Sequence, residues 1–302
     1  MFRYYKHKNI DYQKWDKCIE KAEQATLYAF SWYLDACCMQ TWDALIEEKD
    51  GEYVAVIPLP LRTRWSLKLI SQPFFAQQLG IYGKPSSTFQ IIDFEKIITR
   101  KCFIKITYCF NELNEFQNYS EYRITYQLSL ASSSEELFNN FSSQRKRDIK
   151  KGLKANLTVK SISSTQFWGF YEEYLPGRLS TEKFYFEEGK QVSKVLNERG
   201  LCSYLGVFKE DILVSVYWFS VSKKYITYLG GISNEIGYKH GASSLGFYYI
   251  IKQYDNSERI LDFEGGNNPK IGDFFKGFGA TETQFPTFQR NNVPDILKLF
   301  KR

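Results

Sequence analysis

Hydrophobic and polar positions alternate along the chain with two periods, one typical of helices and one typical of strands. In the first part, apolar residues recur at helical spacing over 11–25 and again over 30–39, where Ser31 is a candidate helix cap. The spacing then becomes strand-like over 44–61 and is interrupted by a polar Asp-Gly turn at 49–51. Such a turn between two apolar runs predicts a β-hairpin.

The rest of the first half mixes both kinds of pattern. Strands are expected over 67–71, 77–82, 102–108 and 122–130, and a helix is expected over 91–100. No stretch of this half collects charged or nucleophilic side chains into a motif. Intermixed helices and strands predict an α/β fold with a mixed sheet.

A strongly basic segment follows a well-marked helix start. Ser133 and Glu136 have the spacing of a capping box, which predicts a helix beginning there. Within the ten residues 145–154, six Lys or Arg stand against one Asp, so the net charge is six minus one, or +5. Ile149 and Leu153 lie four apart, so we expect a helix with one buried stripe and a basic face. That face is either solvated or a docking surface for a phosphate-bearing substrate.

The remaining chain alternates strands and helices. Strands are expected over 201–208, 212–220 and 225–229, and the second of these is apolar almost throughout, as in a central strand covered on both faces. A helix opens near 238–244 and is apolar nearly all round, so it should be buried. A short strand is expected over 259–263.

The composition is that of a globular protein of two domains. Hydrophobic residues make up 43% of the 302 residues and aromatic residues 18%, which excludes a disordered chain. A chain of this length predicts two domains. The formal charge of +6 is compatible with anionic partners without requiring them. No run of about 18 apolar residues occurs and the first residues lack the apolar core of a signal peptide, so we expect a cytoplasmic protein without a transmembrane segment.

Cysteine and histidine are too sparsely placed for two kinds of chemistry. The six cysteines form no C-x-x-C pair, and the two histidines, His7 and His240, stand apart, so no metal site is expected. Neither histidine lies near a nucleophile-elbow motif, which argues against hydrolysis by a catalytic triad.

Small residues open the helix that follows the strand over 225–229. Gly241, Ala242, Ser243 and Ser244 leave backbone N–H groups accessible, and a helix start of this kind binds phosphate through those donors and the helix dipole. Ordinary capping is the alternative explanation of the same pattern.

Two blocks near the C-terminal end make the pattern more specific: Asp262-Phe263-Glu264-Gly265-Gly266 and Phe274-Phe275-Lys276-Gly277-Phe278-Gly279. With the order of strands and helices around them, they resemble the FemABX-like branch of the GNAT acyltransferase superfamily, which pairs two GNAT domains in one chain. The resemblance implies a degenerate GNAT-like domain over 1–130 and a GNAT-like acyltransferase domain over 131–302.

The resemblance also implies a reaction and its co-substrates. The expected activity is N-acyl transfer from an acyl-CoA, such as acetyl-CoA, or from aminoacyl-tRNA to an amine of a sugar, a peptide or a cell-wall or envelope precursor. No tightly bound cofactor is expected. In this interpretation Leu229 and the helix start at Gly241, Ala242, Ser243 and Ser244 bind the donor.

Catalytic roles fall to residues of the two blocks. Phe275-Lys276 matches the Phe-Lys pair of the FemABX-like pattern, and Lys276 is the candidate donor to the developing oxyanion or to the acyl donor's phosphate. Asp262 and Glu264 alternate in the expected strand and so should share one face, where either could accept a proton from the attacking amine. A surface lysine and a structural carboxylate are the alternatives.

The acceptor is expected to be anionic and to meet the basic helix. Arg145, Arg147, Lys150 and Lys151 are its candidate contacts, with Tyr228 from the neighbouring strand.

Two other functional classes compete with this hypothesis. The phosphate-binding motif of GNAT enzymes, which has Arg or Gln three residues before its central Gly, is reduced here to Gly241, and no Tyr precedes the terminal Gly-Phe. A non-catalytic GNAT-fold protein that binds acyl-CoA or another anion would explain both departures. Nucleic-acid binding through the basic helix is the third class, and it overlaps with the first if the donor is charged tRNA.

Overall fold

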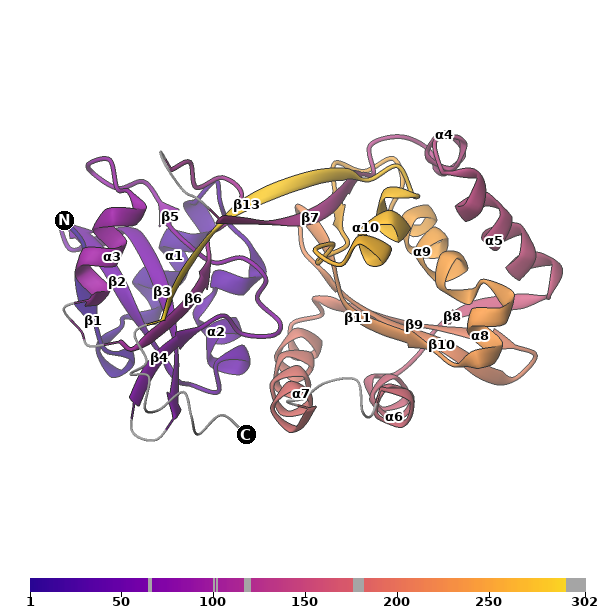
Figure 1. The fold of residues 1–302 in the computed structure, drawn as a ribbon, viewed down its shortest axis with the longest axis horizontal. Coiled ribbons are helices and arrows are strands. Elements are labelled where there is room, and N and C mark those ends of the chain that lie inside the picture. The colour runs from indigo at the N-terminus through magenta and orange to yellow at the C-terminus, as the bar shows by residue number, and fades with distance from the viewer. Residues whose placement is uncertain (65–66, 100, 102, 117–120, 176–181, 292–302) are drawn as a thin grey trace. The chain divides into compact units, whose positions relative to one another are not determined.

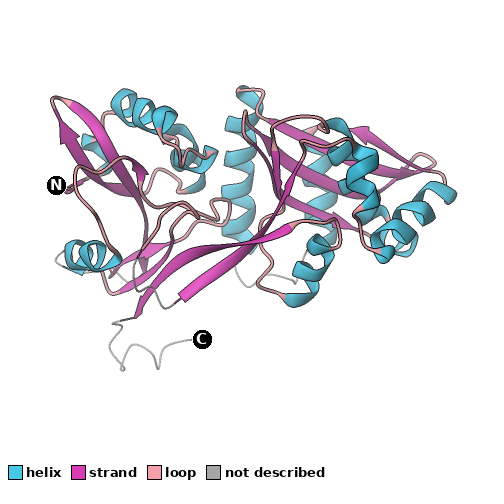
Figure 2. Cartoon of the chain, turned by 90° about the horizontal axis from the view of Figure 1, so that it is seen from above, coloured by secondary structure: helices cyan, strands magenta, loops and turns pink. Residues whose placement is uncertain are grey.

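The computed structural model describes residues 1–64, 67–99, 101, 103–116, 121–175 and 182–291. The chain forms two compact units. Unit 1 comprises Met1–Arg123, Glu188–Val195 and Gln284–Arg302, and unit 2 comprises Ile124–Glu187 and Leu196–Thr283. Helices and strands are intermixed in both units (Figure 2), as the predicted α/β class requires.

Unit 1 is built on a mixed sheet with the strand order β1-β2-β3-β4-β6-β13, in which β5 also pairs with β3. Only β4 and β6 run parallel among these neighbours. Its elements are β1 (Arg3–Tyr5), the 3-10 helix η1 (His7–Asn9), α1 (Tyr12–Lys21), the 3-10 helix η2 (Leu27–Ala29), α2 (Ser31–Cys37), β2 (Trp42–Lys49), β3 (Glu52–Arg64), β4 (Leu67–Ser71), β5 (Tyr82–Gly83), α3 (Ile91–Thr99) and β6 (Lys105–Cys109). Three elements contain residues of both units: β7 (Glu121–Ser129), α7 (Glu182–Glu198) and β13 (Thr281–Asn291).

The predicted hairpin of unit 1 is confirmed, and its turn explains why. Asp50 and Gly51 both have positive φ, 52° and 78°, which is the backbone geometry that a two-residue hairpin turn needs. β2 and β3 pair from Lys49↔Glu52 outward.

Two other expectations for unit 1 are wrong. Residues 77–82 were expected to form a strand, but only Tyr82 belongs to one, in the two-residue β5; Leu79 makes an isolated bridge to Phe110. Ser31 does not cap α2 with its side chain. Its hydroxyl is buried and donates instead to Asp16, at 2.8 Å, because the apolar environment leaves it no water to bind.

Unit 2 has the strand order β7-β12-β11-β10-β9-β8, with β11 and β12 parallel. Its remaining elements are α4 (Ser134–Asn139), α5 (Ser143–Lys154), β8 (Leu157–Ser161), α6 (Ser164–Tyr174), β9 (Cys202–Lys209), β10 (Ile212–Val221), β11 (Tyr225–Ser233), α8 (Glu235–His240), α9 (Ala242–Gln253), β12 (Ile260–Asp262) and α10 (Pro269–Lys276). The capping box predicted at Ser133 and Glu136 is present at the start of α4.

Helices cover both faces of the unit 2 sheet, as Figure 1 shows for α9 on one side and α6 on the other. Side chains alternate across a strand, so neighbours on β10 meet different helices. The Tyr217 ring lies 5.6 Å from that of Phe247 on α9, whereas the Trp218 ring lies 5.5 Å from that of Trp168 on α6. The continuous apolar run of β10 therefore reflects burial on both faces.

The basic helix α5 packs on α9, but not through the pair of residues that its pattern suggested. Ile149 is buried as expected, whereas Leu153 is 55% exposed. Gly152 occupies the contact instead: a Cβ there would lie 3.3 Å from Leu245 Cδ2. The close approach of the two helices depends on a residue that a hydrophobicity pattern does not weigh.

Candidate functional site

Strand β11 separates from its neighbour β12 halfway along its length. The two strands pair only from Tyr225↔Ile260 to Thr227↔Asp262, where β12 ends, while β11 stays paired with β10 as far as Ser233↔Ser215. Within the described chain, the second half of β11 thus has a strand partner on one edge only. An open strand edge offers backbone donors and acceptors to an extended ligand.

A bulge interrupts β11 at the same level. The register with β10 steps from Phe219↔Tyr228 to Trp218↔Gly230, which leaves Leu229 as the extra residue. Bulges re-aim side chains and terminate regular pairing, and they are frequent beside active sites.

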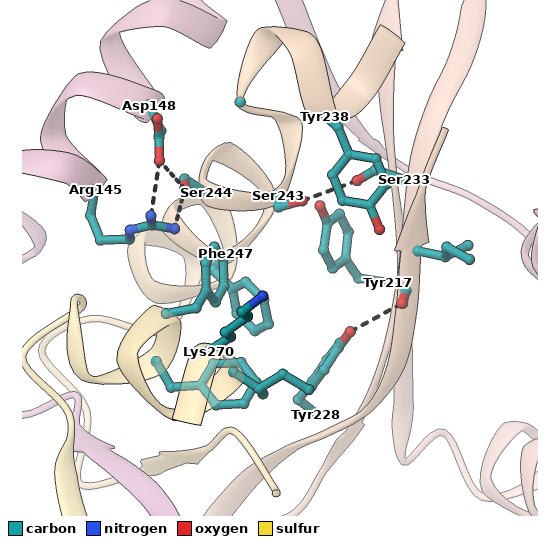
Figure 3. A pocket seen from close by; sticks show the side chains of 16 residues that line it. Arg145, Asp148, Tyr217, Tyr228, Ser233, Tyr238, Ser243, Ser244, Phe247 and Lys270 are labelled. Carbon is teal, nitrogen blue, oxygen red and sulfur yellow. Dashed lines mark hydrogen bonds and ion pairs between the residues drawn. The ribbon is translucent and has the colours of Figure 1, made fainter. Parts of the chain in front are cut away.

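A cavity of about 490 Å³ lies beside this open edge, entirely within unit 2 (Figure 3). Its walls come from α5, β10, β11, the junction of α8 and α9, and α10. The lining residues are Arg145, Asp148, Tyr217, Tyr228, Gly231, Ile232, Ser233, Tyr238, Gly241, Ser243, Ser244, Phe247, Lys270, Ile271, Phe274 and Phe275.

The start of α9 forms one wall of the cavity. Gly241 has φ 75° and stands between α8 and α9, and a Cβ there would lie 2.5 Å from the carbonyl oxygen of Asp148. Only glycine fits this position. Because Gly241, Ser243 and Ser244 line the cavity, the positive end of the α9 dipole faces it. No side chain caps this end of the helix.

Arg145 of α5 contributes a partly buried positive charge. Its guanidinium contacts the Asp148 carboxylate at 3.1 Å and donates to the Ser244 hydroxyl at 3.1 Å. It also lies 4.3 Å from the centre of the Phe274 ring, a cation–π distance. Burial lowers the pKa of Arg145, and Asp148 partly opposes that effect. A Cβ on Gly277 would come within 2.9 Å of Arg145 Cγ, so this glycine makes room for the arginine.

A chain of hydroxyl groups closes the floor of the cavity. Tyr217 donates to the carbonyl of Ala242 at 3.1 Å and accepts from Ser215 at 2.7 Å, and Ser215 and Ser233 are also 2.7 Å apart. Ser233 in turn lies 3.1 Å from Ser243. Burial raises the pKa of Tyr217 to about 12, so this phenol stays protonated at neutral pH.

The residues expected to bind the donor divide into two groups. Gly241, Ser243 and Ser244 line the cavity, whereas Ala242 is buried, is not part of the lining, and accepts a hydrogen bond from Tyr217 with its carbonyl. Leu229 is the bulged residue and is buried, but it is not part of the lining.

The residues expected to bind the acceptor also divide. Arg145 and Tyr228 line the cavity, and the Tyr228 hydroxyl donates to the Gly231 carbonyl at 3.3 Å. Burial raises the pKa of Tyr228 well above its usual value. Arg147, Lys150 and Lys151 are exposed on α5 and stand outside the lining.

The two carboxylates of the Asp262 block occupy different environments. Asp262 is buried at the end of β12 and accepts hydrogen bonds from Thr125 at 2.6 Å, from Gln127 at 3.2 Å and from the backbone of Glu264 at 2.9 Å. Burial raises its pKa and the three donors oppose that shift. Glu264 lies beyond the strand with φ 47°, so the expected alternation of the two on one strand face is wrong.

Lys276 is exposed at the last turn of α10 and does not line the cavity, whereas Lys270 at the first turn of the same helix does. The two lysines are six positions apart, so they leave the helix on different faces. Sequence reasoning missed Lys270, Asp148 and Tyr217. The available signal for Tyr217 was Gly246, a glycine inside an otherwise apolar helix, where a Cβ would lie 2.4 Å from the tyrosine ring.

Comparison with known proteins bears on the fold. No protein-family profile and no curated protein sequence matches the chain. The crystal structure of FemX aligns with a TM-score of 0.66 over 97% of this chain and 99% of that chain, at 14% identity. A tandem GNAT protein from the clavulanic acid biosynthesis pathway, in a structure without AcCoA, aligns with a TM-score of 0.54 over 97% and 99%, at 10% identity. A GNAT-family acetyltransferase from Colwellia psychrerythraea gives 0.53 over 96% and 98%, at 12% identity.

These likenesses show the tandem GNAT fold. The predicted fold class is confirmed, and so, at the level of the fold, is the resemblance to the FemABX-like branch. In the described part of the chain, no three His, Cys, Asp or Glu side chains are gathered closely enough to hold a metal ion. None of the described helices is long and apolar enough to cross a membrane.

Proposed function

We propose that the protein is an N-acyltransferase that binds its acyl donor in the unit 2 cavity. The observation that carries the proposal is the coincidence of three features at one place: the open edge of β11, the bulge at Leu229 and the uncapped start of α9. The open edge suits an extended chain, and the helix start suits an anionic group, so together they suit a donor that has both.

The cavity has a polar wall and an apolar wall, which would contact different parts of the donor. Arg145 and the α9 start would hold the anionic part of the donor, while Phe247, Phe274 and Phe275 would pack against its apolar part. Because Asp148 already pairs with Arg145, the backbone N–H groups at the α9 start would supply part of the hydrogen bonding to the anionic group. An acyl-CoA, such as acetyl-CoA, and the 3′ end of an aminoacyl-tRNA both remain donors in this proposal.

Acyl transfer to an amine needs a polarised carbonyl and a place for the amine's proton. Tyr228 and Tyr217 stay protonated, so they are hydrogen-bond donors rather than bases. The Tyr217 hydroxyl is held by the Ala242 carbonyl, so Tyr228 beside the bulge is the candidate to polarise the donor carbonyl, by giving up its 3.3 Å hydrogen bond to Gly231. Asp262, Glu264 and Lys276 stay proposed catalytic residues. With the donor held in place, correct positioning of the amine supplies much of the rate enhancement.

The proposed acceptor is an amine on a sugar, a peptide or a cell-wall or envelope precursor. The exposed Arg147, Lys150 and Lys151 would meet its anionic groups. We place the protein in the cytoplasm, where acyl-CoA and charged tRNA are available.

Native mass spectrometry with acetyl-CoA, palmitoyl-CoA and aminoacyl-tRNA offered in turn tests the proposal. A mass gain with one donor is expected, and Arg145→Ala should weaken that binding roughly tenfold through the loss of a charged hydrogen-bonding group. Arg147→Ala removes an equal charge from the same helix outside the cavity and should bind like the unchanged protein. No mass gain with any donor, or equal losses in both variants, would contradict the proposal.

A second candidate is a non-catalytic protein of the same fold that binds acyl-CoA or another anion. The position of Lys276 outside the cavity favours it, as does the lack of a Tyr between residues 273 and 278. Lys276→Ala separates the two functions: as a catalytic residue its loss lowers acyl transfer at unchanged donor affinity, whereas in a binding protein it changes neither.

A further inference from the structure

A second charged depression lies in unit 1 and belongs to no part of the site described above. It has a volume of about 490 Å³ and is lined by Tyr4, Lys6, Lys8, Asn9, Lys68 and Lys101. The lysines come from three separate places in the fold: η1 and the residue before it, strand β4, and the turn that follows α3. Four positive side chains and no carboxylate therefore face one hollow.

These four lysines differ from three other lysines of unit 1, which are paired with carboxylates. Lys14, Lys17 and Lys96 each contact a carboxylate within 4 Å, on Glu48, Glu52 and Asp93 respectively. In the described chain no carboxylate forms an ion pair with Lys6, Lys8, Lys68 or Lys101.

Asp43 contacts one residue of the lining, Tyr4, and its carboxylate is already engaged. Asp43 accepts hydrogen bonds from the Tyr4 hydroxyl and, at 2.8 Å, from the backbone N–H of His7. It is absent from the lining of the depression. Its hydrogen bonds fix Tyr4, and the Lys101 ammonium lies 4.7 Å from the centre of the Tyr4 ring. Lys101 is thus held toward the hollow by a cation–π contact.

Like charges gathered around one concave surface repel one another and raise the local electrostatic potential. An anion placed among them relieves that repulsion, and the gain grows with the charge of the anion. A single phosphate group concentrates its oxygen acceptors at one point. Ammonium groups that come from three parts of the fold are better matched by several linked phosphates, whose oxygens are spread over a longer distance. We propose that this depression binds an oligophosphate, the diphosphate or triphosphate group of a small ligand such as a nucleotide.

Isothermal titration calorimetry at low ionic strength tests the proposal with three probes: inorganic phosphate, pyrophosphate and ATP. Pyrophosphate and ATP should bind, and phosphate should bind distinctly more weakly. Equal affinity for pyrophosphate and ATP would mean that the phosphates alone are recognised, and tighter binding of ATP would mean that the nucleoside also makes contacts; both support the proposal. Added salt should weaken the binding.

A matched pair of variants separates the site from bulk charge. Lys68→Gln with Lys101→Gln removes two charges from the depression and should weaken pyrophosphate binding roughly tenfold. Lys223→Gln with Lys224→Gln removes two exposed charges in unit 2. Lys224 also lies over a tyrosine ring, at 5.1 Å, so this control loses a cation–π contact just as the Lys101 variant does. This control should bind pyrophosphate normally.

Three outcomes would overturn the proposal. The first is no binding of pyrophosphate or ATP at low ionic strength. The second is an equal loss in the two double variants, which would assign the binding to net charge. The third is a clear preference for a single-stranded RNA oligonucleotide over ATP, lost in the Lys68 and Lys101 variant, which would make the ligand a nucleic acid. All four positions are exposed, so an unchanged melting temperature is expected and shows that each variant is folded.

Discussion

Gly246→Ala gives the most direct test of how the cavity is built. Gly246 lies inside α9, and a Cβ there would lie 2.4 Å, 2.6 Å and 2.9 Å from three atoms of the buried Tyr217 ring. Alanine favours a helix by about 1 kcal/mol over glycine. Overpacking costs about 1–3 kcal/mol, and each Tyr217 hydrogen bond that is displaced costs about 1 kcal/mol more. The free energy of unfolding should therefore fall by roughly 1–3 kcal/mol.

Urea unfolding followed by circular dichroism measures this change, and Gly169→Ala is the matched control. Gly169 is an exposed glycine inside α6, and a Cβ there would meet no atom within 4 Å. That variant should be up to about 1 kcal/mol more stable than the unchanged protein. If Gly246→Ala proved as stabilising as Gly169→Ala, the tight contact between α9 and Tyr217 would be refuted. The displaced Tyr217 ring should also weaken donor binding in the cavity.

Two further predictions concern backbone geometry and pH. Gly241→Ala should destabilise the protein by about 1–3 kcal/mol more than Gly200→Ala. Both glycines have positive φ, but only at Gly241 would a Cβ clash with a backbone atom, the Asp148 carbonyl oxygen. Thermal unfolding compares the two variants, and equal losses of stability would contradict the clash. Burial raises the pKa of Asp262, so the folded protein keeps this proton to higher pH than the unfolded chain does, and stability should decline as pH rises from about 4 through the folded pKa. Urea unfolding across pH measures this effect. Asp262→Asn should abolish the decline in stability, whereas the control Asp211→Asn, at an exposed position, should retain it.

The sequence predicted the fold well where the local pattern and the tertiary contacts agree. The hairpin turn at Asp50 and Gly51 and the capping box at Ser133 depend on neighbouring residues alone, and both are present. The prediction of a strand over 77–82 was wrong because the apolar residues there are buried without pairing in a β-ladder. The alternation of apolar and polar residues does not distinguish these two kinds of burial.

The candidate site shows the same limit. The helix start at Gly241 was found because small residues before an apolar helix form a local signal. Asp148 and Lys270 were missed because their roles depend on how α5 and α10 pack beside α9. Lys276 was predicted from a sequence motif. Lys270 lies on the same helix, α10, and lines the cavity because its side chain leaves the helix in a different direction from that of Lys276.

Strand β13 begins in unit 2 and continues into unit 1, where Thr287↔Cys109 to Asn291↔Lys105 pair it with β6. Unit 1 therefore receives a sheet strand from nearly the last described residues of the chain. During synthesis its sheet stays incomplete, with the β6 edge uncovered, until residues 287–291 have been made. A fragment ending at Arg123 should consequently aggregate when expressed alone, and supplying residues 281–302 as a separate peptide should improve its solubility.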